Sequence, residues 1–126
     1  MNTTRIPVGD RGMYIHIPFC RQKCTYCDFP SYQGLEDYFD VYAYALRQEI
    51  ESSQSLLGTD PFDTIYFGGG TPTVLSIKEL NRILEIVYNT YTISSDVEIT
   101  IEANPGEVDT QYLRHLYELG INRISF

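Results

Sequence analysis

Three cysteines lie close together near the start of this 126-residue chain, and they are the only cysteines in it. They are Cys20, Cys24 and Cys27, separated first by three residues and then by two. Three thiolates at these spacings can close over one face of a cubane iron–sulfur cluster and ligate three of its irons. Because such clusters are usually held by four thiolates, one iron would stay open to a small molecule, as the free position of a catalytic zinc ion does. The cysteines therefore predict chemistry or sensing at a ligand-binding cluster.

Two other roles for the three cysteines have to be weighed. A disulfide framework is disfavoured by the odd number of cysteines and by the lack of a basic, apolar leader before Gly12. A Cys₃His zinc site would need His16, which lies four residues before Cys20 on an expected strand, whereas such sites usually pair their ligands in tight knuckles. The spacing favours the cluster, and the zinc site stays as the alternative.

Composition limits the classes of partner. The chain has nine Lys and Arg against seventeen Asp and Glu, a net charge of −8, which argues against nucleic acid as a main partner. Its length suits one domain with a core of its own. No apolar run approaches the ~20 residues that a membrane span requires. Clustered free thiols fit a reducing compartment, which favours the cytoplasm.

The elements that would position the cysteines begin with a short strand. Residues 1–12 carry no periodicity and are expected to form an N-terminal tail. Residues 13–17 are apolar-rich and predict a strand that ends at Pro18. The cysteine loop follows and is expected to run to about residue 34.

A helix and a second strand are expected next. Over residues 35–53 apolar side chains recur at helical spacing, at Phe39, Tyr42, Ala43, Leu46 and Ile50. The dipeptide at residues 60–61, Asp-Pro, interrupts the chain. Residues 64–67 predict the second strand.

The second half repeats this alternation. Ser76-Ile-Lys-Glu79 is a capping box that opens a helix. Residues 97–102 alternate apolar and polar side chains, as a third strand does. Asp109 is expected to cap a further helix that Gly120 ends as its C′ residue, and residues 121–126 begin a fourth strand. The buried face of the helix after Ser76 is expected to be Leu80, Ile83, Leu84 and Val87.

Alternating strands and helices predict an α/β fold with a parallel sheet and right-handed crossovers. The pattern alone does not separate a doubly wound open sheet from part of a (βα) barrel. An unfinished fourth strand would leave a bare sheet edge, although parallel sheets are normally covered. Residues 13–126 are therefore expected to be the N-terminal part of a larger domain, truncated at its C-terminal end.

Three features follow the ends of the first three strands, where parallel α/β folds gather their ligands. They are the cysteine loop, the run Gly-Gly-Gly-Thr-Pro at residues 68–72, and Glu102. Glycines let backbone groups approach a polar ligand such as the zwitterionic end of an amino acid, and a carboxylate at a strand end suits ribose hydroxyls. A tight turn and an exposed carboxylate are the simpler alternatives. His16 shares strand parity with Tyr14, so both are expected to face one side of the sheet.

Four motifs in order resemble the radical S-adenosylmethionine superfamily, in the branch that contains oxygen-independent coproporphyrinogen III oxidase and the HemW-type heme chaperones. They are the Cys-x₃-Cys-x₂-Cys loop with Tyr-Ile-His-Ile-Pro-Phe before it, Gly-Gly-Gly-Thr-Pro at 68–72, Glu-Ala-Asn-Pro-Gly at 102–106 and Gly-Ile-Asn-Arg-Ile-Ser at 120–125. The resemblance covers residues 13–126. It implies the N-terminal part of a partial (βα) barrel with parallel strands, the core of this superfamily.

The resemblance also implies cofactors and the residues that hold them. Cys20, Cys24 and Cys27 would ligate a 4Fe–4S cluster whose open iron is chelated by S-adenosylmethionine. In enzymes of the family the reduced cluster splits the sulfonium to a 5′-deoxyadenosyl radical, so a small electron donor protein is an expected partner. The positions that match S-adenosylmethionine contacts are Tyr14, Tyr26, Gly69, Gly70, Thr71 and Glu102.

Within this branch, one difference in the cysteine motif distinguishes the oxidase from the chaperones. The cysteine motif of the oxidase resembles Cys-x₃-Cys-x₂-Cys-x-Cys. Its fourth cysteine stands where this chain has Phe29, which follows Asp28. The Cys-Asp-Phe ending resembles the chaperones, which implies a heme or porphyrin ligand and heme-acceptor proteins as partners. The heme-binding region is expected beyond Phe126. The alternative is the oxidase, a decarboxylating enzyme of porphyrin biosynthesis.

Overall fold

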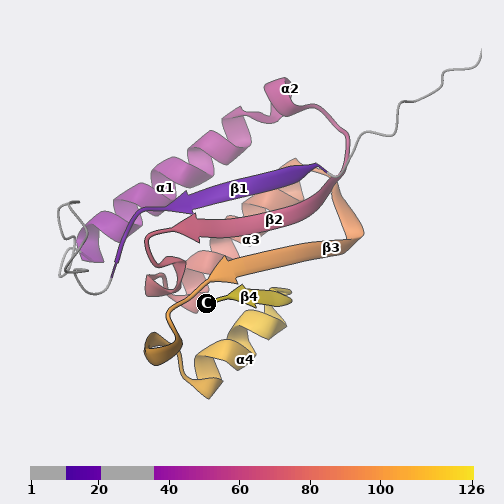
Figure 1. Ribbon diagram of the computed structural model, residues 1–126. Helices are drawn as coiled ribbons and strands as arrows, with labels where there is room; N and C mark the ends of the chain where they lie inside the picture. The colour runs from indigo at the N-terminus through magenta and orange to yellow at the C-terminus, as the bar shows by residue number, and fades with distance from the viewer. Residues whose placement is uncertain (1–10, 21–35) are drawn as a thin grey trace, which may run out of the picture.

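A computed structural model describes residues 11–20 and 36–126 of the chain. Its strands form one sheet in the order β1-β2-β3-β4, and every neighbouring pair is parallel (Figure 1). The predicted parallel α/β fold is thereby confirmed. The strands are β1 (Gly12–Ile17), β2 (Phe62–Gly69), β3 (Ile93–Glu102) and β4 (Arg123–Ser125).

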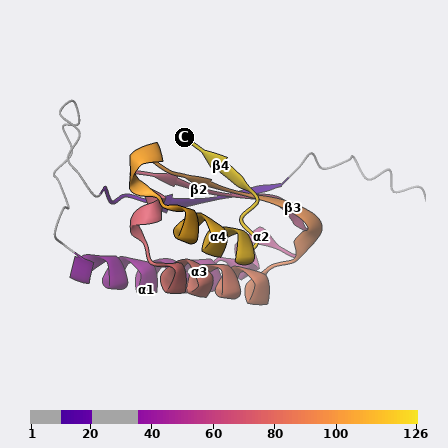
Figure 2. The same cartoon turned by 90° about the horizontal axis from the view of Figure 1, so that it is seen from below.

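The helices decide which kind of parallel fold this is. Figure 2 shows α1, α3 and α4 together on one face of the sheet, and no described helix covers the other face. A doubly wound sheet carries helices on both faces and reverses its strand order. Consecutive strand order with helices on one side is instead the wall of a (βα) barrel. The helices are α1 (Glu36–Ser52), α2 (Gln54–Leu57), α3 (Ile77–Thr90) and α4 (Thr110–Glu118), with short 3₁₀ turns η1 (Pro72–Val74) and η2 (Pro105–Glu107).

The hydrophobic core lies between the sheet and these helices. The four residues predicted for the buried face of α3 are all buried, and on α1 Ala43 and Ile50 are buried while the rest of its predicted face packs partly buried against the core. The strands contribute Ile15, Ile17, Ile65, Phe67, Ile99 and Ile101. Alternate strand residues therefore point into the core, and the residues between them face the open side of the sheet.

Local signals at the helix N-termini are confirmed with one difference. The Ser76 hydroxyl accepts a hydrogen bond from the Glu79 amide (3.1 Å), and the Asp109 carboxylate accepts one from the Tyr112 amide (2.7 Å). The Glu79 carboxylate pairs with Arg47 of α1 instead of returning to the cap. Half of the predicted capping box is thus used to join α1 to α3.

Gly120 ends α4 as predicted. It has a φ of +99°, in the left-handed region that favours glycine. Its amide donates to the carbonyl of Tyr117 (3.0 Å), and the Ile121 amide donates to the carbonyl of Leu116 (3.1 Å). These two bonds form a Schellman motif, which turns the chain from α4 back toward the sheet.

The strand bounds differ from the sequence-based expectation at β2 and β3, which both begin earlier than predicted. The pairing shifts register between Phe62 and Thr64, so the alternation of side chains is broken there. The Ser94 hydroxyl donates to the Asp63 carboxylate (2.6 Å) at this irregular end. Polar side chains that bond across the strands hide the strand pattern in this part of the sequence.

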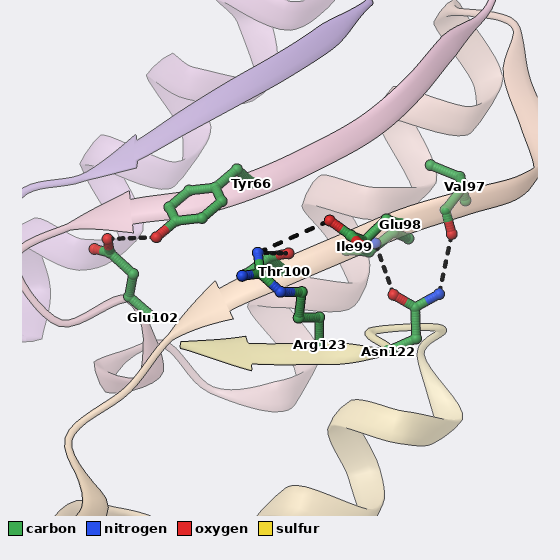
Figure 3. A network of polar contacts seen from close by, with 8 residues as sticks. All are labelled: Tyr66, Val97, Glu98, Ile99, Thr100, Glu102, Asn122 and Arg123. Carbon is green, nitrogen blue, oxygen red and sulfur yellow. Dashed lines mark hydrogen bonds and ion pairs between the residues drawn. The ribbon is translucent and has the colours of Figure 1, made fainter. Parts of the chain in front are cut away.

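The fourth strand is shorter than expected because a side chain pairs in place of backbone (Figure 3). The Asn122 side chain accepts from the Ile99 amide (2.9 Å) and donates to the Val97 carbonyl (3.0 Å). The Asn122 amide also donates to the Ile99 carbonyl (3.0 Å). Asn122 thus fastens the start of β4 to β3 from both its backbone and its side chain.

The start of β1 is anchored to the loop before β2. The Arg11 guanidinium donates to the carbonyls of Leu57 (2.7 Å) and Asp60 (2.8 Å) and lies 4.2 Å from the centre of the Phe62 ring. Residues 1–10 of the expected N-terminal tail lie outside the described residues. Within the described ranges, no helix has the length and apolar character needed to cross a membrane.

Candidate functional site

The cysteine loop, the glycine run and Glu102 were predicted to lie together at the carboxyl ends of the strands, and the described residues of all three do so. Cys20 is the third residue after β1, Gly69 is the last residue of β2, and Glu102 is the last residue of β3. The strands are parallel and in register, so their carboxyl ends meet at this edge. The fourth strand adds Ser125, the register partner of Glu102.

The glycine run is bonded directly to the start of the cysteine loop. The Gly70 amide donates to the Ile17 carbonyl (2.8 Å), and the Thr71 amide donates to the Phe19 carbonyl (2.6 Å). These bonds continue the pairing of β1 with β2 beyond the strands themselves. They fix the backbone immediately before Cys20, whose thiol is free and half-buried.

Gly70 has a second reason to be a glycine that the sequence did not suggest. A Cβ at this position would lie 2.5 Å from the Phe19 carbonyl oxygen and 3.0 Å from the Cys20 sulfur. Gly69 has a φ of +119°, and a Cβ there would lie 2.7 Å from the Ile17 carbonyl oxygen. The space left by both glycines is therefore needed for close packing of the chain against itself. Their contact with a ligand stays a prediction.

Glu102 is held from β2 through both of its carboxylate oxygens. Oε1 accepts from the Gly69 amide (3.0 Å) and Oε2 from the Tyr66 hydroxyl (2.7 Å; Figure 3). Each carboxylate oxygen has a further lone pair with which it can accept another hydrogen bond. Glu102 is thus an oriented acceptor at the carboxyl end of the sheet.

Tyr66 was missed by the sequence analysis, as was the reason for Gly68. The Tyr66 ring stacks on that of Tyr14, with centroids 5.7 Å apart and an interplanar angle of 13°. A Cβ on Gly68 would lie 2.6 Å from the Tyr14 hydroxyl and 2.9 Å from a Tyr66 ring carbon. The signal was present in the sequence, because Tyr66 and Gly68 share strand parity, but their register with Tyr14 was needed to use it.

His16 lies beside this pair of tyrosines. Its ring centroid is 6.0 Å from that of Tyr14, and both side chains are exposed on the open face of the sheet, as their strand parity predicts. Tyr14, Tyr66 and His16 therefore form an aromatic row across the open face. It leads from β1 toward Glu102.

The Tyr66 hydroxyl stays protonated and so remains a hydrogen-bond donor to Glu102. Its hydrogen bond to the Glu102 carboxylate raises the pKa of Tyr66 above its ordinary value of 10.0, and a hydrogen bond with Ser125 opposes part of that rise. The phenol accordingly stays protonated throughout the physiological range.

A pocket of about 180 Å³ opens beside Glu102. Thr71 lines it, and its hydroxyl accepts a hydrogen bond from the Asn104 side-chain amide (3.3 Å). Backbone, hydroxyl, amide and carboxylate groups provide donors and acceptors together, which suits a polar ligand. The lining residues are Gly70, Thr71, Glu102, Ala103, Asn104, Ser125 and Phe126.

Three predicted site residues, Cys24, Tyr26 and Cys27, lie outside the described residues. Among the residues that the structure describes, no three His, Cys, Asp or Glu side chains gather as metal ligands. Only one of the three predicted thiolates belongs to that part of the chain. The described part of the site is therefore the carboxyl end of the sheet, where the cysteine loop begins after β1.

The chain matches one protein family over nearly its whole length. The model of the Radical SAM superfamily matches residues 14–126. Two heme chaperones named HemW are similar: that of Bacillus subtilis is 40% identical over 117 residues, and that of Synechocystis is 44% identical over 118 residues. The matches cover 92% and 89% of this chain, but 31% and 28% of those proteins.

The porphyrin-related branch is matched as well. An oxygen-independent coproporphyrinogen III oxidase of Salmonella typhimurium is 33% identical over 122 residues, covering 96% of this chain and 27% of the oxidase. A solved structure of coproporphyrinogen III oxidase (HemN) from Escherichia coli, titled a radical SAM enzyme, superimposes with a TM-score of 0.83 and 32% identity. It covers 91% of this chain and 27% of that structure. The chain spans about a third or less of the length of these relatives.

Proposed function

The chain belongs to the radical S-adenosylmethionine superfamily, and we propose that it supplies the cofactor-binding part of a heme chaperone of the HemW type. Such a protein would bind a 4Fe–4S cluster and S-adenosylmethionine and pass heme to acceptor proteins. The choice of the chaperone over the oxidase rests on Phe29, which stands where the oxidase motif has an additional cysteine. The likeness to heme chaperones at 40% and 44% identity supports it.

Cys20, Cys24 and Cys27 would hold the cluster, which when bound supplies an electron to the sulfonium of S-adenosylmethionine. The described part of the site fits this role. The Cys20 thiol is free and half-buried, and two hydrogen bonds from the glycine loop fix the backbone just before it. A side chain at Gly70 would collide with the Phe19 carbonyl oxygen and crowd the Cys20 sulfur. A rigid backbone at the first ligand suits a cluster that must keep one iron accessible.

S-adenosylmethionine would lie along the carboxyl ends of β1 to β3. Glu102 would accept hydrogen bonds from ribose hydroxyls, because its two oxygens are oriented by Gly69 and Tyr66 and still have free lone pairs. Gly69, Gly70 and Thr71 would offer donors and acceptors to the amino acid end. Tyr14 would contribute an exposed ring beside them. Tyr26 would complete the set from the cysteine loop.

The remaining partners follow from the same proposal. A small electron donor protein would reduce the cluster, and the heme would be received and delivered by parts of the protein beyond Phe126. Free thiols as cluster ligands suit the reducing cytoplasm. The net charge of −8 supports protein and cofactor partners over nucleic acid.

A second candidate is the oxidase itself, favoured by the likeness to the Escherichia coli enzyme at a TM-score of 0.83 and to the Salmonella enzyme over 96% of this chain. The two functions differ in turnover. The oxidase converts coproporphyrinogen III to protoporphyrinogen IX by decarboxylation. A chaperone needs no such conversion.

An oxidase assay separates the two. The full-length protein, reconstituted without oxygen and supplied with a reductant and S-adenosylmethionine, is expected to leave coproporphyrinogen III unchanged. It is also expected not to support anaerobic growth of an oxidase-deficient strain. Formation of protoporphyrinogen IX at the rate of a genuine oxidase, run in parallel, would overturn the choice of branch.

A further inference from the structure

We propose that Tyr66 is a positioning residue for the binding of S-adenosylmethionine, acting through the Glu102 carboxylate and the Tyr14 ring. The inference rests on the proposed function and adds a residue to it. Tyr66 lies at the centre of β2 between the two strands that carry those side chains: its register partners are Tyr14 on β1 and Thr100 on β3. From there its side chain extends toward the carboxyl end of the sheet, where its hydroxyl meets Glu102.

The first contact of Tyr66 fixes the direction of Glu102. The hydroxyl donates to Oε2 (2.7 Å) while the Gly69 amide donates to Oε1 (3.0 Å), and the two donors together define the plane of the carboxylate. Figure 3 shows the Tyr66 hydroxyl and the Glu102 carboxylate directed at each other across β2 and β3. Without the hydroxyl, the carboxylate would keep only the amide and could rotate about it. Its free lone pairs would then no longer be held toward a ribose.

The second contact supports Tyr14. The Tyr14 side chain is 58% exposed, so it has little other packing to hold it on the open face. The nearly parallel Tyr66 ring, 5.7 Å away, supplies that packing. Gly68 makes the arrangement possible, since a side chain there would collide with both tyrosines. One residue thus orients two positions that are expected to contact the same ligand.

The two contacts can be separated by substitution. Tyr66→Phe removes the hydrogen bonds of the hydroxyl with Glu102 and Ser125 and keeps the ring that stacks on Tyr14. Tyr66→Leu removes both. Tyr117→Phe is the matched control, because it deletes the phenol hydroxyl of a residue on α4 that is 76% exposed.

The test measures the dissociation constant for S-adenosylmethionine on full-length protein reconstituted with its cluster. Tyr66→Phe is expected to raise it about tenfold, the size of one lost hydrogen bond to a charged group, with iron and sulfide content unchanged. Tyr66→Leu is expected to raise it further, and Tyr117→Phe to leave it unchanged. In a Glu102→Ala background, Tyr66→Phe is expected to change it less than twofold, because the hydroxyl acts through the carboxylate.

The outcomes distinguish this inference from the function on which it rests. If the unaltered, cluster-loaded protein does not bind S-adenosylmethionine, the proposed function and the inference both fail. If it binds and Tyr66→Phe binds equally well, only the positioning role fails. Equal losses from Tyr66→Phe with and without the Glu102 carboxylate would also overturn that role, because a purely structural effect would persist without its partner.

Discussion

At the scale of single residues, the contact between Gly70 and Cys20 links two motifs that lie fifty residues apart in the sequence. A Cβ at Gly70 would collide with the Phe19 carbonyl oxygen and would lie close to the Cys20 sulfur. The Thr71 amide is bonded to that same carbonyl (2.6 Å). The glycine loop is therefore packed directly against the backbone that carries the Cys20 thiol.

Gly70→Ala is expected to lower cluster content. The added methyl group would have to push the Phe19 carbonyl away, because the clash at 2.5 Å is with backbone and not with a flexible side chain. Moving that backbone displaces Cys20. The measurement is iron and acid-labile sulfide per chain after anaerobic reconstitution. We expect less than about half of the unaltered value, since a ligand misplaced by a fraction of an ångström weakens a preorganised site.

Gly106→Ala is the matched control for this substitution. A Cβ at Gly106 would meet nothing within 4 Å, and its backbone does not require glycine. This variant is expected to assemble the cluster fully. Full assembly in Gly70→Ala as well would contradict the link between the glycine loop and the cysteine loop.

Residue types indicate a candidate site at the carboxyl ends of the strands, but not the contacts within it. Cys20, Gly70 and Glu102 are singled out because they follow or close three strands whose carboxyl ends gather ligands in parallel α/β folds. The Tyr66–Glu102 bond and the Gly68–Tyr14 contact depend on which residues are opposite one another in β1, β2 and β3. Register is set by tertiary packing, so it could not be read from one sequence.

At the scale of helices and strands, the elements that carry strong local signals were predicted closely. Ser76 and Asp109 cap α3 and α4 through backbone amides three residues on, and Gly120 ends α4 in a Schellman motif. These signals act within a few residues, so the sequence contains them in full. The early parts of β2 and β3 were missed because their pairing is irregular there.

Asn122 is the element-scale feature with the largest expected effect on stability. Asn122→Ala would leave the partly buried Ile99 amide without its partner and would also remove an exposed hydrogen bond to the Val97 carbonyl. We expect the free energy of unfolding to fall by about 1–3 kcal/mol, the cost of unsatisfied backbone groups. Denaturant unfolding of the full-length protein measures it.

Asn89→Ala provides the comparison, because Asn89 is exposed near the end of α3. Alanine favours a helix at such a position, so this variant is expected to be no less stable than the unaltered protein. Equal stability of the two variants would mean that the side chain of Asn122 does not fasten β4 to β3.

At the scale of the whole chain, the helices on one face and the polar, aromatic residues on the other divide the sheet by function. The core lies on the helix side, and Tyr14, His16 and Tyr66 lie on the open side. Sequence periodicity could predict strands and helices but not this one-sided arrangement, which depends on the order of strands in the sheet. In a (βα) barrel the open face is the interior, and ligands bind at the carboxyl ends of the strands, which is where this aromatic row meets Glu102.

A heme titration tests the proposal that this chain is part of a heme chaperone which uses an iron–sulfur cluster and S-adenosylmethionine. The full-length protein, carrying its reconstituted cluster, is titrated with heme and followed by absorption spectroscopy without oxygen. We expect saturable binding that shifts the heme spectrum while the cluster stays intact. A spectrum that remains that of free heme at every ratio would contradict it.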